Sequence, residues 1–557
     1  MTQKTQTPLE RFFNILKLDR KDIYQIFFYA IFAGLISLSL PLGIQAIINL
    51  IQSARLSVSW IVLVVVVVIG VALVGLLSIM QLRITENLQQ KIFIRSSFEF
   101  GYRLPKIKFE ERYQYYPPEL ANRFFETLTI QKGISKLLID FSTALLQIAF
   151  GLLLLSLYHP FFIFFGILLL LLLYSIFRFS YHSGLSTSLN ESKYKYKVVG
   201  WLQEMARNNF SFQKRESFEF GLEKNDSLVA EYLKYREKHF NVIKKQFGQL
   251  IAFKVTITAS LLLIGGFLVI KQQMNIGQFV AAEIIILLVI NSVEKIIVGL
   301  ETFYDVITSI EKIGQISDLE IEELTNQKHE TPPANIILET TDVGFKFPDS
   351  NKAVLEQTTL KIESCERIIV EGDNNSGKTT LLKILAGYLP PTSGTFHIHD
   401  DNYQKISLNQ YRSHIGTLFQ GETPFEGTIL ENITFNNPNI SADNLKWAIE
   451  GVELGDFIKS LPEGLHTKIH PEGNSLSTSN AQKILLARSI INKPKILFYE
   501  DPLEIMDEVT THKIIDFITA PQQQWTVVVV SKNKYWANKC SRKINISQGK
   551  IIVDSLN

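Results

Sequence analysis

The sequence has very little cysteine and almost no net charge. Its 557 residues include two cysteines, Cys365 and Cys540, and 56 basic residues stand against 54 acidic ones. Two distant cysteines indicate a reducing compartment rather than a disulfide framework. The balanced charge gives no sign of a nucleic-acid partner. We also find no metal-ligand cluster, no low-complexity tract and no cleavable signal peptide.

Long apolar runs are abundant instead, and all of them precede residue 300. They cover residues 23–51, 58–80, 137–158, 161–178, 250–270 and 279–298. Each is long enough, or nearly so, to cross a hydrocarbon core that needs about 20 residues. The sequence therefore predicts six membrane spans, with membrane lipid as their surroundings.

The links between the spans alternate between very short and very long. The long links, 81–136 and 179–249, are rich in Lys and Arg, and the short links contain almost none. By the positive-inside bias, both termini and both long links are cytoplasmic, which predicts an integral protein of the inner (cytoplasmic) membrane. We expect the long links to be helical extensions of the spans. Pro117-Pro118 should break the first extension, and the second should turn near 214–218.

Residues 8–22 predict a short amphipathic helix before the first span. Its apolar face would hold Phe12, Phe13, Ile15 and Leu16, and its water-facing side Arg11, Lys17, Arg20 and Lys21. Such a pattern fits an ordinary surface helix or a helix lying at the membrane interface. The adjacent apolar run favours the interface.

A few polar residues interrupt the apolar runs: Gln45, Gln147, Glu283 and Asn291. An ionisable group at membrane depth is costly, so we expect Glu283 to face the bundle interior or water. Either it lines a substrate path, or it forms a hydrogen bond between helices or lies at the membrane interface, and the sequence leaves these interpretations open.

The composition changes after the last run. Residues 312–333 are polar and end near Thr331-Pro332-Pro333, which indicates a linker. We predict an N-terminal helix at 1–22, a six-span membrane domain at 23–311, this linker, and a soluble domain at 334–557. The predicted fold class is an α-helical membrane bundle of six spans with long cytoplasmic helical extensions, followed by an α/β domain.

One stretch of the last domain has a specific chemistry. The residues are Gly372-Asp373-Asn374-Asn375-Ser376-Gly377-Lys378-Thr379-Thr380, placed between an apolar strand and an amphipathic helix. Glycines let successive backbone N–H groups point at phosphate oxygens, and the helix N-terminus adds partial positive charge. Lys378 would reach the outer phosphates and the Thr379 hydroxyl would hold Mg²⁺. The loop predicts binding of ATP with Mg²⁺, and with it the fold class of the last domain, an α/β P-loop ATPase domain.

Further motifs make nearly the whole chain resemble the ABC exporter family. Phe347 matches the aromatic residue that stacks on adenine, and Gln420 matches the glutamine that touches Mg²⁺ and faces the membrane domain. The segment from Phe425 to Ile433 and Asp507 also match. The resemblance implies an exporter half that works with a second half-transporter chain, as a homodimer or a heterodimer, with two ATPs between the two nucleotide domains.

The residues that finish hydrolysis depart from the family pattern. The signature Leu-Ser-Gly-Gly-Gln appears as Leu476-Ser477-Thr478-Ser479-Asn480, so Ser477 keeps its hydroxyl while two glycines gain side chains. By the resemblance, Glu500 takes the metal-facing place and the shorter Asp501 the place of the general base. Lys532 stands where histidine is usual and cannot act as a neutral imidazole. The positions that would bind ATP are all kept, whereas those that would act in hydrolysis are changed. This contrast predicts ATP binding with slow or absent hydrolysis.

Three functions fit these motifs. The first is a half-transporter that hydrolyses ATP slowly or depends on ATP hydrolysis by a partner chain. Residues 37–48 resemble the first span of haemolysin- and bacteriocin-type secretion transporters, which implies a polypeptide cargo, a periplasmic adaptor and an outer-membrane channel. Because about 22 residues precede the first span, we expect no N-terminal peptidase domain. The second is an inactive ATP-binding scaffold or regulator, and the third is a membrane protein gated by nucleotide.

Overall fold

The computed structural model describes residues 6–52, 58–322 and 335–556. The chain divides into two compact units, Met1–Ile321 and Glu322–Asn557. Each unit is described separately below.

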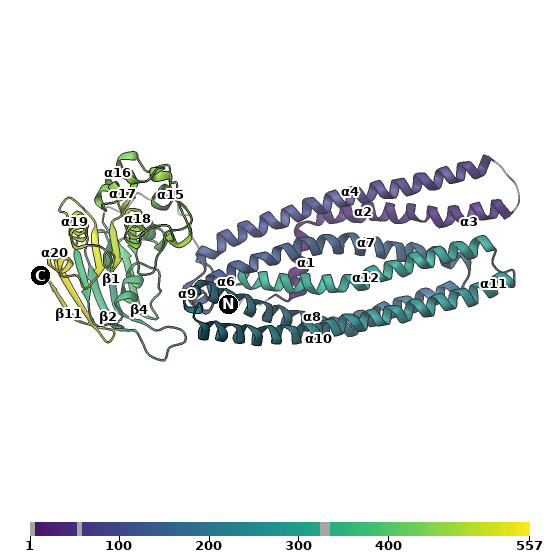
Figure 1. The fold of residues 1–557 in the computed structure, drawn as a ribbon, viewed down its shortest axis with the longest axis horizontal. Helices are drawn as coiled ribbons and strands as arrows, with labels where there is room; N and C mark the ends of the chain where they lie inside the picture. Colours follow the sequence, from purple (N-terminus) through teal and green to yellow (C-terminus); the bar gives the residue numbers. More distant parts are fainter. Residues whose placement is uncertain (1–5, 53–57, 323–334, 557) are drawn as a thin grey trace. The chain divides into compact units, whose positions relative to one another are not determined.

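The first unit consists of long helices that run side by side (Figure 1). Their bounds are α1 (Pro8–Leu18), α2 (Arg20–Ser37), α3 (Ser39–Gln52), α4 (Val58–Arg103), α5 (Phe109–Gln114), α6 (Pro117–Asn122), α7 (Glu126–Tyr158), α8 (Phe161–Arg207), α9 (Asn209–Phe212), α10 (Arg215–Ser260), α11 (Gly266–Ile270) and α12 (Ile276–Ser317). A single π-helical turn, Leu261–Gly265, joins α10 to α11. Within the described residues, six helical segments are long and apolar enough to cross a membrane, as predicted.

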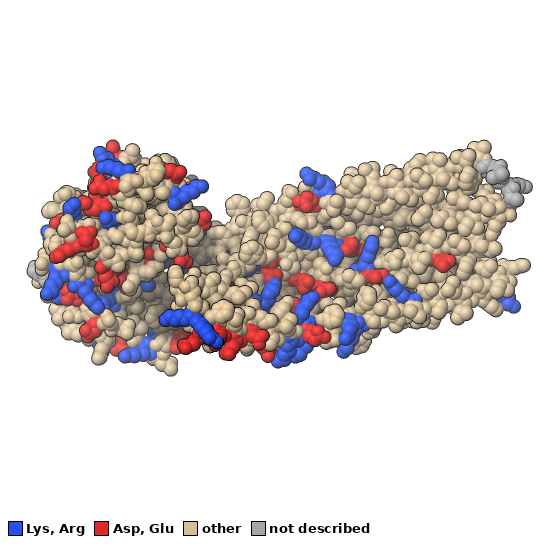
Figure 2. Space-filling model, viewed as in Figure 1, with Lys and Arg blue, Asp and Glu red and all other residues tan. Residues whose placement is uncertain are grey.

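Charge is distributed unevenly along this unit. In Figure 2, Lys, Arg, Asp and Glu gather on one part of the helical unit, while the part that holds the start of α4 and α11 is mostly tan. Many large apolar side chains of α4 are exposed there, including Val62, Val65 and Val68. An exposed apolar surface of this extent fits contact with hydrocarbon rather than water.

The two helical extensions turn where short helices interrupt them. The first extension already ends at Arg103, where a 3₁₀ turn, Leu104–Lys106, and the short α5 follow α4. The short helix α6 then begins at Pro117 and Pro118, as predicted. The second turns between Asn208 and Lys214, through α9, and α10 already begins at Arg215. This turn lies slightly before the predicted position near 214–218, where Arg215 and Glu219 instead form an ion pair within the first turns of α10.

The N-terminal helix packs against the bundle. Phe12, Ile15 and Leu16 of α1 lie on a buried cluster that includes Val306 of α12. The prediction that Arg11 faces water is wrong. The residue is 8 % exposed, and its guanidinium forms ion pairs with Glu311 and Asp318. Glu311 of α12 and Asp318, which follows this helix, provide charges that a helical-wheel argument on α1 alone does not include.

The polar residues inside the spans have different surroundings. The Tyr158 hydroxyl donates to Gln45 Oε1 at 2.5 Å, and the Ser292 hydroxyl donates to Gln147 Oε1 at 2.8 Å, so both glutamines join helices. Glu283 is half-buried, and Asn291 is exposed. Contact of Glu283 with a substrate path therefore stays a prediction.

Helix α12 continues to Ser317, beyond the start of the predicted linker at 312. Residues 313 and 316 remain in apolar clusters, which explains why the helix does not end there. Most of the rest of the predicted linker, 323–333, lies outside the described residues.

The second unit is built on β-sheets with helices packed on them. An antiparallel sheet has the order β2-β1-β4, a short ribbon pairs β6 with β7, and the main sheet has the order β11-β10-β3-β9-β8-β5. The strands are β1 (Ile337–Phe345), β2 (Leu355–Ile362), β3 (Arg367–Glu371), β4 (Ser393–His399), β5 (Ile415–Leu418), β6 (Gly427–Thr428), β7 (Lys468–Ile469), β8 (Ile496–Glu500), β9 (Thr526–Val530), β10 (Arg542–Ser547) and β11 (Lys550–Leu556). The helices are α13 (Lys378–Leu385), α14 (Leu408–Ser413), α15 (Ile429–Thr434), α16 (Ala442–Gly451), α17 (Gly455–Ser460), α18 (Thr478–Ile490), α19 (Glu508–Ile518) and α20 (Lys534–Lys539).

The order of the main sheet determines where a site can form. Strands β10, β3, β9, β8 and β5 are parallel neighbours. Their apolar residues are buried on both faces, as in β9, where all five residues are buried. Because the carboxyl ends of parallel strands meet at one edge, the loops after β3, β5, β8 and β9 lie next to each other.

Two glycines of α8 provide a matched test of packing in the first unit. A Cβ on Gly184 would lie 2.3 Å from the ring of Tyr304, which is fully buried and bonded to Gln246. A Cβ on Gly200 meets nothing within 4 Å. We expect Gly184→Ala to destabilise the protein by about 1–3 kcal/mol through overpacking. Gly200→Ala should leave stability unchanged or raise it by up to about 1 kcal/mol, since Ala favours helix. Thermal unfolding in detergent measures both, and equal shifts would contradict this packing.

Candidate nucleotide-binding site

The loop after β3 curls as the sequence predicts for phosphate binding. Gly372 has φ 146° and Gly377 has φ 103°, both in the region that favours glycine. A Cβ on Gly372 would lie 2.1 Å from the carbonyl oxygen of Ile546, and one on Gly377 would lie 2.8 Å from that of Val354. The backbone passes so close to its neighbours that only glycine fits. Gly377 caps α13, so the N-terminus of this helix opens into the loop.

A buried carboxylate joins three of the strand ends. Glu500, the last residue of β8, is 7 % exposed and accepts a hydrogen bond from the Thr379 hydroxyl. Its other oxygen accepts from the Gln420 backbone N–H at 3.3 Å. The three residues that the sequence assigns to Mg²⁺ therefore lie together. A hydroxyl and a carboxylate oxygen are hard ligands of the kind that Mg²⁺ prefers.

Two lysines face the same loop. Lys378 Nζ donates to the carbonyl oxygens of Gly372, at 2.8 Å, and Asp373, at 2.6 Å. Lys532 Nζ donates to Asn374 Oδ1 at 3.2 Å. Burial and the nearby charge of Lys532 lower the pKa of Lys378. Two cations held on a loop with a free helix N-terminus form a site that an anion would stabilise, so the residues present fit a polyphosphate.

Asp501 follows Glu500 in a strained backbone conformation, with φ 41°. Its N–H donates to the Val530 carbonyl at 2.8 Å, and its carboxylate accepts from the Ser531 hydroxyl and the Lys532 N–H. Burial, followed by the charge of Glu504, raises the pKa of Asp501. The carboxylate proposed as general base is thus bonded to the loop after β9.

The remaining predicted residues lie around this centre. Asn375, at φ 62°, and the buried Ser376 complete the loop, and Thr380 is buried in α13. Phe347, just after β1, packs edge-on against Phe345. Ser477 caps α18 and accepts from the Asn480 N–H, so its recorded bond stays within its own helix.

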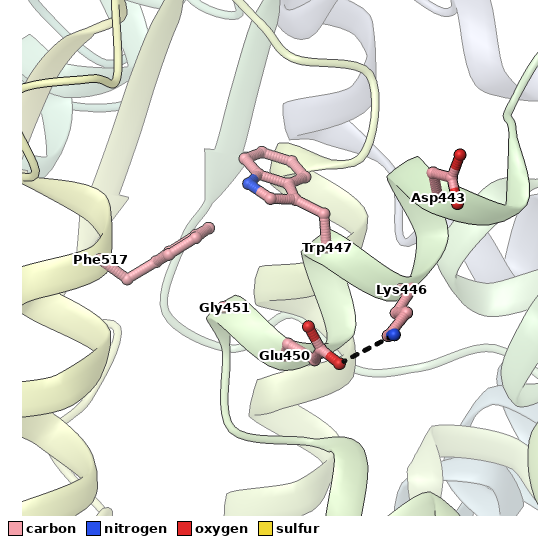
Figure 3. A pocket seen from close by; sticks show the side chains of 6 residues that line it. All are labelled: Asp443, Lys446, Trp447, Glu450, Gly451 and Phe517. Carbon is pink, nitrogen blue, oxygen red and sulfur yellow. Dashed lines mark ion pairs between the residues drawn. The ribbon is translucent and has the colours of Figure 1, made fainter.

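A separate hollow of about 430 Å³ lies between α16 and α19 (Figure 3). Trp447 and Phe517 point toward it, with ring centroids 5.4 Å apart. The other lining residues are Asp443, Lys446, Glu450 and Gly451. None of its lining residues belongs to the nucleotide motifs, so the hollow is not part of the candidate site.

Comparisons with known proteins agree with this geometry. Residues 355–504 match the ABC transporter family model, and this segment spans β2 to just beyond β8. A solved structure of a bacterial Atm1-family ABC exporter with ATP bound aligns with a TM-score of 0.79 at 16% identity, over 96% of this chain and 95% of that one. The chain therefore contains an ABC transporter domain, and its two units have the fold of an ABC exporter.

Curated relatives add homology over a shorter stretch. The lactococcin-A transport/processing ATP-binding protein LcnC of Lactococcus lactis is 26% identical over 334 residues, which are 59% of this chain and 46% of that protein. The alpha-hemolysin translocation ATP-binding protein HlyB of Escherichia coli is 25% identical over 330 residues, 56% of this chain and 46% of that protein. The chain spans about half the length of these relatives, and it is homologous to exporters of the HlyB and LcnC type.

The two lysines generate a test of the site. Lys378→Ala should abolish ATP binding, because the cation nearest the loop is lost. Lys532→Met should weaken ATP binding by about tenfold, the effect of losing one charge-assisted contact. Lys534→Met is the matched control, since Lys534 is an exposed lysine at the start of α20. Titration with a fluorescent ATP analogue measures all three, and equal affinity for wild type and Lys532→Met would contradict a phosphate contact by Lys532.

Proposed function

We propose that this chain is one half of an ABC-type exporter that binds Mg²⁺–ATP between two nucleotide units and hydrolyses it slowly. The observation that carries the proposal is the contrast between binding and hydrolytic residues. Lys378, Thr379 and Glu500 are brought together by bonds within the loop and between strand ends. The family's hydrolytic positions hold a shorter carboxylate and a lysine instead.

The position of Asp501 supports slow hydrolysis. A general base has to reach the attacking water, and a misplacement of about 1 Å can cost on the order of a hundredfold in rate. Asp501 is one methylene shorter than glutamate, and its carboxylate is engaged by Ser531 and the Lys532 N–H. Bound ATP supplies a polyphosphate that bridges two nucleotide units, and the residues of this chain would hold it there.

The signature segment acts on the partner's ATP in this proposal. Thr478 is exposed and Ser479 half-buried at the start of α18, where the family has two glycines. Their side chains would keep the helix N-terminus further from a phosphate. A homodimer would have two impaired sites, and a heterodimer with a complete partner would still have one site built with Thr478 and Ser479.

The same observations favour a second candidate, an ATP-binding scaffold or regulator without turnover. Transport remains our first proposal because the whole chain has the exporter fold.

We place the protein in the inner membrane with its nucleotide unit in the cytosol. The homology to HlyB and LcnC suggests a polypeptide cargo, with a periplasmic adaptor and an outer-membrane channel as partners.

Restoring the family's residues tests the proposed cause of slow turnover. The double variant Asp501→Glu with Lys532→His should raise the ATPase rate of the purified protein by at least about tenfold, since the base and its partner regain their geometry. Lys378→Ala in the same background is the control and should remove the gain. An unchanged rate in the double variant would show that these two positions do not limit hydrolysis.

Copurification from native membranes distinguishes the two candidates. If the chain and every ABC chain that copurifies with it bind ATP but release no phosphate, the scaffold replaces the exporter. Phosphate release that depends on a second, distinct ABC chain would support a heterodimeric transporter. Adaptor-type proteins in the same preparation would support secretion.

A further inference from the structure

A polar cavity lies among four helices of the first unit, outside the apolar runs that predict the spans. Its volume is about 210 Å³, which is below the roughly 300–1,000 Å³ of drug-sized pockets. It is lined by Glu126 and Thr129 of α7, Ser188, Glu191, Ser192 and Lys195 of α8, Arg236 of α10, and Asp305, Thr308 and Ser309 of α12. These helices run side by side (Figure 1).

Most charges of the cavity wall are already paired. Glu126 accepts from Lys195 Nζ at 2.6 Å, from the Tyr196 hydroxyl at 2.8 Å and from the Ser309 hydroxyl at 2.6 Å. Burial alone raises the pKa of Glu126, but Lys195, Ser309 and Tyr196 together hold it below its usual value. Glu191 accepts from Arg236 Nη1 at 3.2 Å. Both cations of the wall are thus already paired with carboxylates, Lys195 with Glu126 and Arg236 with Glu191.

Asp305 is the exception. Within the described residues it has neither an ion pair nor a hydrogen bond, and Arg236 and Lys195 act on it only as more distant charges. Three lining carboxylates face two lining cations, and Asp305, which is exposed at the cavity, is the carboxylate without an ion pair. Two hydroxyls of the wall are open as well. The Ser192 Oγ has no hydrogen-bond partner, and the residue is only 6 % exposed. Thr129 is half-buried, and its hydroxyl forms no hydrogen bond with the described residues.

We propose that this cavity binds a primary alkylammonium group. Such a group offers one positive charge and three N–H donors. The Asp305 carboxylate would balance the charge, and the hydroxyls of Ser192 and Thr129 would accept the other N–H bonds. An anion would meet the free carboxylate, and a metal ion lacks ligands, because the described residues contain no group of three His, Cys, Asp or Glu side chains placed to hold one. This site needs no nucleotide, so it stands apart from the proposed function.

Ligands of matched size test the proposal on the full chain in phosphatidylcholine nanodiscs without nucleotide. n-Butylammonium should bind saturably, at one site per chain, in saturation-transfer NMR. Butyrate should bind at least about tenfold more weakly, because its charge faces Asp305. Putrescine and N-acetyl-lysine methylamide, used as competitors, show whether a small polyamine or a lysine side chain suits the cavity better. Equal binding of butyrate, or no binding of n-butylammonium, would overturn the proposal.

Variants of the wall identify the groups that bind. Asp305→Asn should weaken n-butylammonium by about tenfold or more, and Ser192→Ala by a smaller factor, as expected for one charged and one neutral acceptor. Asp226→Asn, an exposed carboxylate on α10, is the matched control and should leave the affinity unchanged. Thermal unfolding confirms that each variant is folded. Unchanged affinity in folded Asp305→Asn would contradict the assignment.

The pH dependence provides a readout that a structural role would not change. Asp305 is exposed at the cavity, yet the protein atoms packed around its carboxylate, and then the charges of Glu301 and Glu191, raise its pKa to about 6, while Arg236 and Lys195 act in the opposite direction. Asp305 is therefore ionised above pH 6 and takes up a proton below it. Affinity for n-butylammonium should fall between pH 7.5 and 5.5 in the wild type and stay flat in Asp305→Asn. A wild-type affinity that rises toward low pH would contradict the proposal.

Discussion

The nucleotide site depends on one buried carboxylate. Glu500 ends β8 and accepts hydrogen bonds from the Thr379 hydroxyl and the Gln420 N–H. These partners come from the start of α13, which follows β3, and from the loop after β5, two separate parts of the sequence that share one edge of the parallel sheet. A buried charge is costly unless it is bonded on all sides, so Glu500 constrains the loops that surround it. A metal ion would bring a further compensating charge to this point.

The same sheet edge explains why binding and hydrolysis are separable. The lysines Lys378 and Lys532 and the curled loop form a cationic cradle that needs no general base. Asp501 lies one residue beyond Glu500, but its strained backbone and its bonds to the loop after β9 direct the carboxylate toward that loop. Phosphate binding and activation of the attacking water therefore depend on different side chains.

Local patterns in the sequence predicted much of this architecture. Six spans, the start of a short helix at Pro117-Pro118 and the loop between β3 and α13 follow from hydropathy, proline and glycine spacing, which are local signals. The burial of Arg11 was missed because its partners, Glu311 and Asp318, lie about three hundred residues away. The cavity around Asp305 was missed for the same reason. A signal existed in α8, where Ser188, Glu191, Ser192 and Lys195 recur at helical spacing on a polar face.

The central claim is that the chain binds ATP but does not hydrolyse it rapidly. The identity of the nucleotide that stays bound tests this claim directly. Purified protein is incubated with Mg²⁺ and ATP for a fixed time, separated from free nucleotide, denatured and analysed by chromatography. Our account predicts that the retained nucleotide is intact ATP. Retained ADP, with phosphate released at the 1–10³ s⁻¹ range typical of enzymes, would contradict it.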